Sequence, residues 1–276
     1  MSAGRKNSAF ASHFSLRSSA ILHPADCRDA VRSTMSGRFR MIAVGAALTL
    51  IIGHGHLAAE SGPPLRIGHY STGSELIGFV IDRMGTPIKL RFDGSDEILA
   101  LTTEQAPYNS MTLKRDDGVS VLRIYETGRI LIFSDKLSGG SADAYRDQDA
   151  EPLAVKRATK EQAETEAESL GRRLKRAGAP ELAISLDAPR LSADAAAWSA
   201  MADAIAVTGA TLAEMLTSPI AREIIAAKLR RVVIRDADQV NVRLADDTLI
   251  VEVEAREPIT GRPSSARLKS AIGDLL

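Results

Sequence analysis

Few side chains after the N-terminal stretch have the types and spacing that catalysis needs. Residues 60–276 contain one histidine, His69, and no cysteine, because the single Cys27 comes earlier. Zinc sites use several histidine or cysteine ligands, so these residues cannot build a site of that kind. A serine–histidine–aspartate triad around His69 remains open, although no G-x-S-x-G nucleophile elbow accompanies it. We expect His69 to be an incidental polar residue near an entry strand.

Other catalytic patterns are incomplete. Serine–lysine catalysis in its commonest form needs Ser-x-x-Lys, and the nearest pairs, Ser110/Lys114 and Ser265/Lys269, are one residue too far apart. The glycine loops that bind nucleotide phosphates are missing as well. The sequence therefore names no catalytic residue and predicts no cofactor.

Two short acidic runs carry the oxygen ligands that calcium prefers. The first contains Asp147, Asp149 and Glu151, and the second contains Asp236 and Asp238. Neither run has the glycine and the distant glutamate of an EF-hand loop, so we expect solvated turns and no metal site. Two carboxylates far apart in the sequence could still cleave a glycosidic bond, but nothing here picks out such a pair.

Residues 1–59 differ from the rest of the chain in charge. They hold seven of the 35 basic residues and two of the 35 acidic ones, which leaves a formal charge of −5 on residues 60–276. A basic start followed by the uncharged run 41–52 and by small residues is typical of a secretory signal peptide. We expect translation to start at Met35, cleavage to follow Ala59, and the mature protein to be periplasmic or secreted.

The uncharged run is too short for a comfortable membrane-spanning helix. Twelve residues span about 18 Å as a helix, against a hydrocarbon core of about 30 Å. We therefore expect no stable membrane span after cleavage. An organellar transit peptide is the alternative for this serine- and arginine-rich start. The mildly acidic remainder has no excess positive charge for phosphates, so we expect no nucleic acid as a partner.

Residues 60–135 have the pattern of short antiparallel strands. Apolar and polar residues alternate, and Asp93-Gly94 and Asp117-Gly118 are typical of hairpin turns. We predict about six strands in an antiparallel β meander or small barrel. The four tyrosines fall in or beside this β-rich unit: Tyr70, Tyr108, Tyr125 and Tyr145. Residues 136–158 are predicted to be a linker.

Residues 159–276 are predicted to form an α+β unit. A charged helix over 159–177 comes first, and Thr159 with Gln162 fits a capping box. The order of elements after it is predicted to be β-α-α-β-β-β-α. Ser264 or Ser265 is expected to cap the last helix. The fold class is therefore α+β.

Two segments resemble a known family. The first is Asp116-Asp117-Gly118 with Val121-Leu122-Arg123, Gly128 and Phe133, and the second is the run GRPSSAR at 261–267. Both resemble an uncharacterised family of exported bacterial proteins that is known as a domain of unknown function. The resemblance covers most of 65–275. It implies bacterial export and no activity, so it transfers no site residue.

We expect a non-catalytic periplasmic binding or interaction protein whose partner is a protein or an envelope component, since tyrosine is favoured at contact surfaces. Two alternatives stay open. One is a carboxylate-based hydrolase acting on cell-envelope glycans. The other is a self-associating structural envelope protein, a homodimer through helix 159–177, whose apolar residues have heptad-like spacing.

Overall fold

The structure, a computed structural model, describes residues 65–73, 77–189, 191 and 194–274. The predicted leader, with its signal peptide and cleavage point, lies outside these residues. The described residues belong to one compact unit with two large hydrophobic cores. One core lies inside the N-terminal strands, and the other lies among the C-terminal helices and sheet. The architecture is α+β, as predicted.

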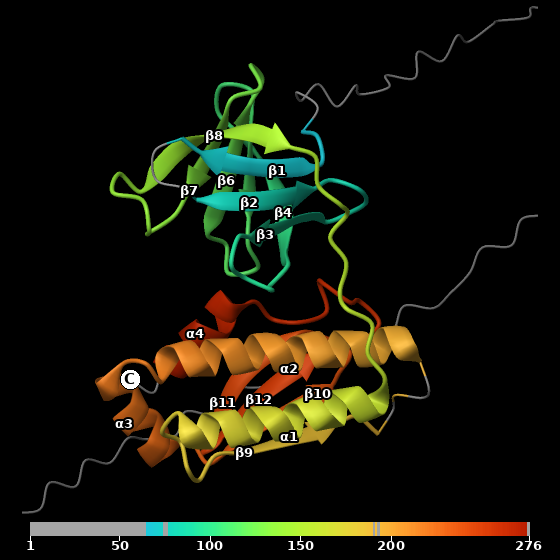
Figure 1. Cartoon of the computed structure of the whole chain (residues 1–276), viewed down its shortest axis with the longest axis vertical. Coiled ribbons are helices and arrows are strands. Elements are labelled where there is room, and N and C mark those ends of the chain that lie inside the picture. Colours follow the sequence, from blue (N-terminus) through green and yellow to red (C-terminus); the bar gives the residue numbers. More distant parts are fainter. Residues whose placement is uncertain (1–64, 74–76, 190, 192–193, 275–276) are drawn as a thin grey trace, which may run out of the picture. The chain divides into compact units, whose positions relative to one another are not determined.

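Eight strands close into a barrel in which each strand pairs antiparallel with the next and β8 returns to β1 (Figure 1). Gly94, Gly118 and Gly128 in the connecting turns have positive φ angles, which glycine adopts without steric cost. The prediction of a small antiparallel barrel is confirmed. The strands are β1 Gly68–Thr72, β2 Gly78–Asp82, β3 Ile88–Phe92, β4 Leu99–Ala106, β5 Ser110–Lys114, β6 Ser120–Tyr125, β7 Ile130–Phe133 and β8 Ser141–Gln148.

Strand β8 closes the barrel within a segment that was predicted to be linker. It pairs with β7 on one side and with β1 on the other. Its sequence, SADAYRDQ, lacks apolar alternation, and Ala144 is its one buried residue. The strand exists because two neighbouring edges supply hydrogen-bond partners, which no local pattern reveals. Strand β1 also lies outside the six expected strands, so the barrel has eight.

The C-terminal part has the predicted order, a lead helix followed by β-α-α-β-β-β-α. The sheet order is β11-β12-β10-β9, with β10 parallel to both of its neighbours and β11–β12 an antiparallel hairpin. Helix α1 packs along β9, α2 along β10 and β12, and α4 along β11 (Figure 1). The elements are α1 Lys160–Arg176, β9 Ala183–Asp187, α2 Ala195–Met215, α3 Pro219–Lys228, β10 Arg231–Asp236, β11 Asn241–Ala245, β12 Thr248–Val253 and α4 Ser265–Gly273.

Helix α1 begins with the predicted capping box of Thr159 and Gln162. Its apolar stripe is buried against α2, where Gly209 has no side chain. A Cβ at Gly209 would lie 2.5 Å from Leu170 Cδ1. A homodimer through helix 159–177 would therefore have to use the charged face of the helix, and it stays a prediction. The buried stripe consists of Ala163, Ala167, Leu170 and Leu174.

Helix α2 is the centre of the C-terminal core. Trp198, Met201 and Ile205 are buried there. By length and composition α2 could also cross a membrane, but 67% of its apolar window is buried inside the protein. Core helices of globular proteins have the same property, so this is weak evidence for a membrane span.

Candidate functional site

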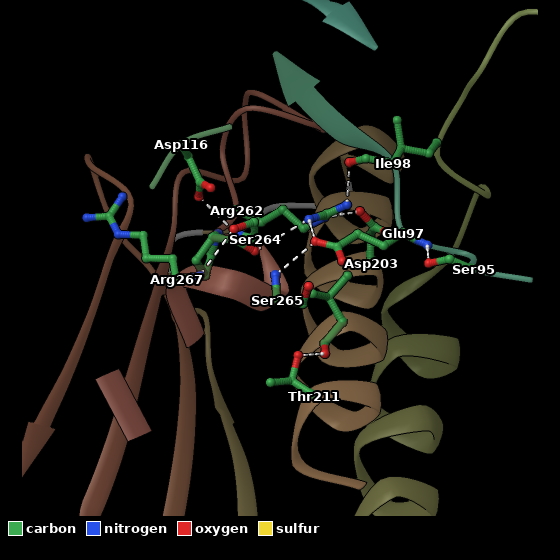
Figure 2. A network of polar contacts seen from close by, with 12 residues as sticks. Ser95, Glu97, Ile98, Asp116, Asp203, Thr211, Arg262, Ser264, Ser265 and Arg267 are labelled. Atoms are coloured by element: carbon green, nitrogen blue, oxygen red, sulfur yellow. Dashed lines mark hydrogen bonds and ion pairs between the residues drawn. The ribbon is translucent and has the colours of Figure 1, made fainter. Parts of the chain in front are cut away.

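A buried arginine joins the barrel to the C-terminal part. Arg262 lies in the loop before α4, and its side chain is 2% exposed. Its Nε donates to Asp203 of α2, its Nη2 donates to the Ile98 carbonyl oxygen at 2.9 Å, and its Nη1 lies 3.6 Å from Glu97 Oε1. Figure 2 shows these groups around the guanidinium. Since Glu97 and Ile98 belong to the β3–β4 connection, Arg262 ties that connection to α2.

The first turn of α4 adds two hydrogen bonds to the barrel. The amide of Ser264, the N-cap residue, donates to Asp116 Oδ2 at 2.9 Å, and the amide of Ser265 donates to Glu97 Oε1 at 2.8 Å (Figure 2). Amides at a helix N-terminus lack intrahelical partners, and the helix dipole favours negative charge there. The two carboxylates therefore stabilise α4 from outside. We call this group the latch: Arg262, Asp203, Glu97, Asp116 and the amides of Ser264 and Ser265.

The loop that presents Arg262 requires glycine at position 261. The Gly261 amide donates to the Glu257 carbonyl oxygen, and the Gly261 carbonyl accepts from the Glu254 amide, both at 2.7 Å. A Cβ at Gly261 would lie 2.0 Å from the Glu254 oxygen and 2.3 Å from the Glu257 oxygen. Backbone atoms cannot yield as a side-chain tip can, so only glycine fits.

A cavity of about 220 Å³ lies beside the latch. Ile98, Ala100 and Ile259 are among its apolar lining residues, and Asp116 and Arg262 are among its charged ones. Both of these charged residues already have partners within the latch. Their role here is to hold the structure together.

A buried carboxylate holds the segment that leaves the barrel. The side chain of Asp82 is fully buried and accepts from the Met84 amide at 2.7 Å, from Lys89 Nζ at 3.0 Å and from the Leu153 amide at 2.9 Å. Burial by itself raises the pKa of Asp82, but these hydrogen bonds outweigh it and lower the pKa below its usual value. Asp82 is therefore a structural anion.

His69, the one histidine of residues 60–276, lies on β1 between two carboxylates. Its Nδ1 is 2.6 Å from Asp147 Oδ1, and its Nε2 is 2.9 Å from Asp93 Oδ2. Partial burial lowers the pKa of His69, but hydrogen bonds to Asp93 and Asp147 raise it above 6.5 overall. Because both ring nitrogens are engaged, neither is free to take a proton from a serine. The triad that the sequence left open is not assembled around His69.

The other residues considered for chemistry have separate partners. Asp149 pairs with Arg146, whereas Asp147 contacts His69, so these two carboxylates of the first acidic run are directed at different partners. Ser110 Oγ donates to the Pro107 carbonyl oxygen at 2.7 Å, and Lys269 pairs with Glu214. Within the part of the chain that the structure describes, no three His, Cys, Asp or Glu residues are arranged to hold a metal ion.

The barrel exterior carries an aromatic and charged cluster that sequence reasoning did not assemble. The guanidinium of Arg129 lies 5.6 Å from the ring centroid of Tyr125, and both its Nε and its Nη2 donate to the carboxylate of Asp143. Tyr145 follows Asp143 by two residues on β8, so both lie on the outer surface. The Tyr145 residue is 65% exposed. We call Tyr125, Arg129, Asp143 and Tyr145 the tyrosine face.

A further tyrosine lies at a neighbouring turn. Tyr108, in the β4–β5 connection, is 91% exposed and has a φ of 62°, and Asn109 after it has a φ of 49°. Left-handed conformations are costly for tyrosine. Asn109 Nδ2 donates to Glu126 Oε2 at 3.1 Å, which connects this turn to the one that follows Tyr125.

Comparison with known proteins gives one match. A family model described as a domain of unknown function, DUF4908, matches residues 52–272. The chain belongs to the DUF4908 family. No curated protein and no solved structure matches the chain.

The structure gives a physical role to both segments on which the family resemblance rested. Asp116, from the first segment, accepts a hydrogen bond from the amide of Ser264, in the second segment. Gly261 and Arg262 of the second segment shape and anchor the same contact. In this DUF4908 chain, the two segments therefore meet at the latch, 148 residues apart in the sequence.

Proposed function

We propose that this DUF4908 protein is an exported, non-catalytic binding protein that contacts an envelope component through the exterior of its barrel. The observation that carries the proposal is the tyrosine face. Tyrosine and arginine are the side chains that most often supply binding energy at contact surfaces. Here they are outward on a closed barrel, whose strand pairing fixes their spacing before any ligand arrives.

The latch and Asp82 support the same proposal because they act as parts of a rigid scaffold. Their charges are buried within internal hydrogen bonds, whereas the Arg129–Asp143 pair of the tyrosine face lies at the surface beside the Tyr125 ring. A protein that binds through one surface benefits from a rigid scaffold, because less freedom is lost on binding.

A carboxylate-based hydrolase requires an acid whose pKa is raised, so that it is protonated at neutral pH. In this structure the pKa values of three partly or fully buried or hydrogen-bonded carboxylates are lowered instead. The hydrogen bond from His69 lowers the pKa of Asp147, and the hydrogen bond from Arg235 lowers the pKa of Glu252. Asp82 has a lowered pKa too. These carboxylates favour structural ion pairs over acid catalysis.

Export is tested by the N-terminal sequence and the compartment of the mature protein, measured by mass spectrometry on fractionated cells. A start at Glu60 in the periplasm or the medium is expected. An intact N-terminus in the cytosol would contradict the proposal.

The contact surface is tested by photo-crosslinking in cells that express the full chain. A photoreactive phenylalanine replaces Tyr145 in one variant and Ile220 in another, because Ile220 is a comparably exposed residue on α3. Crosslinks to an envelope component are expected from position 145. Equal crosslinking from position 220, or none from position 145, would overturn the assignment of the surface.

A further inference from the structure

The tyrosine face has flat apolar surface and hydrogen-bonding groups side by side. Tyr125 and Tyr145 supply aromatic rings, and the Arg129 guanidinium is held between the Tyr125 ring and the Asp143 carboxylate. Two contacts therefore hold one planar cation in place. Such a preorganised group keeps its orientation when a ligand binds.

Strand β7 extends the apolar part of this surface. Ile130 and Ile132 are buried in the barrel core, so the alternating residues Leu131 and Phe133 face outward, and both are partly exposed. Leu131 is paired with Asp143 on β8. The outer surface of β6, β7 and β8 thus alternates apolar and polar groups over a short distance.

A sugar ring matches this combination of groups. Its C–H faces are apolar and pack against aromatic rings, whereas its hydroxyl groups both donate and accept hydrogen bonds. Arg129 supplies donors and Asp143 supplies acceptors. Because Arg129 and Asp143 form an ion pair, the pair itself has no net charge. We propose that the tyrosine face binds a glycan chain, an inference that rests on the proposed binding function and names its ligand class.

A protein partner fits the same surface less well. Stable protein interfaces bury about 800 Å² on each partner, with an apolar centre. The large apolar side chains that are most exposed, apart from the tyrosines, lie elsewhere in the described part of the chain. Met84 is in the β2–β3 turn, Val119 in the β5–β6 turn and Ile220 on α3. The tyrosine face alternates aromatic rings with a charged pair, which is the combination that a glycan requires.

The test is retention of the purified mature chain on insoluble peptidoglycan, cellulose and chitin. We expect retention on at least one of these. The variants Tyr145→Ala and Arg129→Ala should each lower the affinity about tenfold, since each removes one stacking or hydrogen-bonding group. Tyr145→Phe should keep most of the affinity because the ring remains. Ile220→Ala is the matched control and should bind like the wild type.

Two results would overturn the glycan inference. One is a wild-type chain that none of the three polymers retains. The other is retention that stays unchanged in both Tyr145→Ala and Arg129→Ala while their melting temperatures match that of the wild type. If crosslinking from position 145 then captures a defined envelope protein, the glycan inference falls and the proposed binding function stands. If the protein is cytosolic and binds none of the three polymers, both the glycan inference and the proposed function as an exported binding protein are contradicted.

Discussion

Two arginine–carboxylate sites in this chain have similar chemistry and opposite surroundings. Arg262 is buried, and its partners come from the β3–β4 connection and from α2. Arg129 is exposed, and its partner Asp143 is on the same barrel surface. Removing a charge from water is costly unless every group around it is satisfied, so the buried site has no freedom to exchange partners. The exposed site loses little hydration when its ion pair forms, and both groups stay accessible to solvent.

Substitution of Arg262 should have the largest effect on stability. Arg262→Ala leaves the partly buried carboxylates of Asp203 and Glu97 without their buried cation, and breaking one side of a buried pair costs about 3–5 kcal/mol. The free energy of unfolding from urea titration measures this cost. Arg262→Lys should recover part of it, because lysine keeps the charge and loses the fork of donors. A loss below about 1 kcal/mol in Arg262→Ala would show that the latch does not hold the fold.

Substitution of Asp82 should have the second largest effect on stability. Asp82→Ala leaves Lys89 and the Leu153 amide without their buried acceptor, which we expect to cost about 2–3 kcal/mol. Because the pKa of Asp82 is lowered in the folded state, its contribution is present above the ordinary value of 3.8 and is lost as the pH falls through the folded value. Urea titrations at pH 7 and at pH 3 test both statements. Asp96→Ala is the control, since Asp96 and its partner Lys156 are both highly exposed, and it should leave stability unchanged.

His69 should contribute less than Asp82 to the free energy of unfolding, and its contribution should have the opposite dependence on pH. Its folded pKa is raised, so its contribution is complete below 6.5 and is lost as the pH rises through the folded value. His69→Gln should therefore destabilise the chain by about 1 kcal/mol or less at pH 5.5, because both carboxylate partners are solvent-exposed. The difference between wild type and variant should shrink at pH 8.5. A difference that grows with pH would contradict the placement of His69 between Asp93 and Asp147.

Substitution at the exposed arginine should have the smallest effect on stability. Arg129→Ala removes an ion pair that water already screens, so the melting temperature should stay within measurement error of the wild type. Its effect should appear in binding. A strongly destabilised Arg129→Ala would mean that the tyrosine face is part of the scaffold, and the contrast with Arg262 would disappear.

Much of the fold was predictable because its signals are local. The capping box at Thr159 and Gln162 places the start of α1, and Asp246–Asp247 places the turn of the β11–β12 hairpin. Asp246 has a φ of 53° there, a conformation that aspartate tolerates better than most residues. Strand β8 had no such signal, because its single buried residue, Ala144, gives no period to detect.

The candidate site was less predictable than the fold. The tyrosines were noticed by type, but nothing in the sequence indicated that Arg129 would lie against Tyr125 and Asp143. The glycine and arginine at 261–262 were noticed as a motif, without a partner. A partner is defined by strand register and helix packing, and neither can be read from spacing along the chain.

The sequence alone determined the α+β class, the order of the C-terminal elements, most of the hairpin turns and the caps of α1 and α4, whereas α2 is capped by Asp194 instead of the Ser192 that its pattern suggested. These features depend on a few neighbouring residues, whose periodicity, φ preferences and capping side chains act over short distances. Tertiary structure alone decided that β8 would close the barrel against β1, that Asp116 would meet Ser264, and that Arg262 would be buried while Arg129 stayed exposed. Burial is a property of the assembled surfaces, and it makes one ion pair a structural contact and leaves the other exposed to solvent.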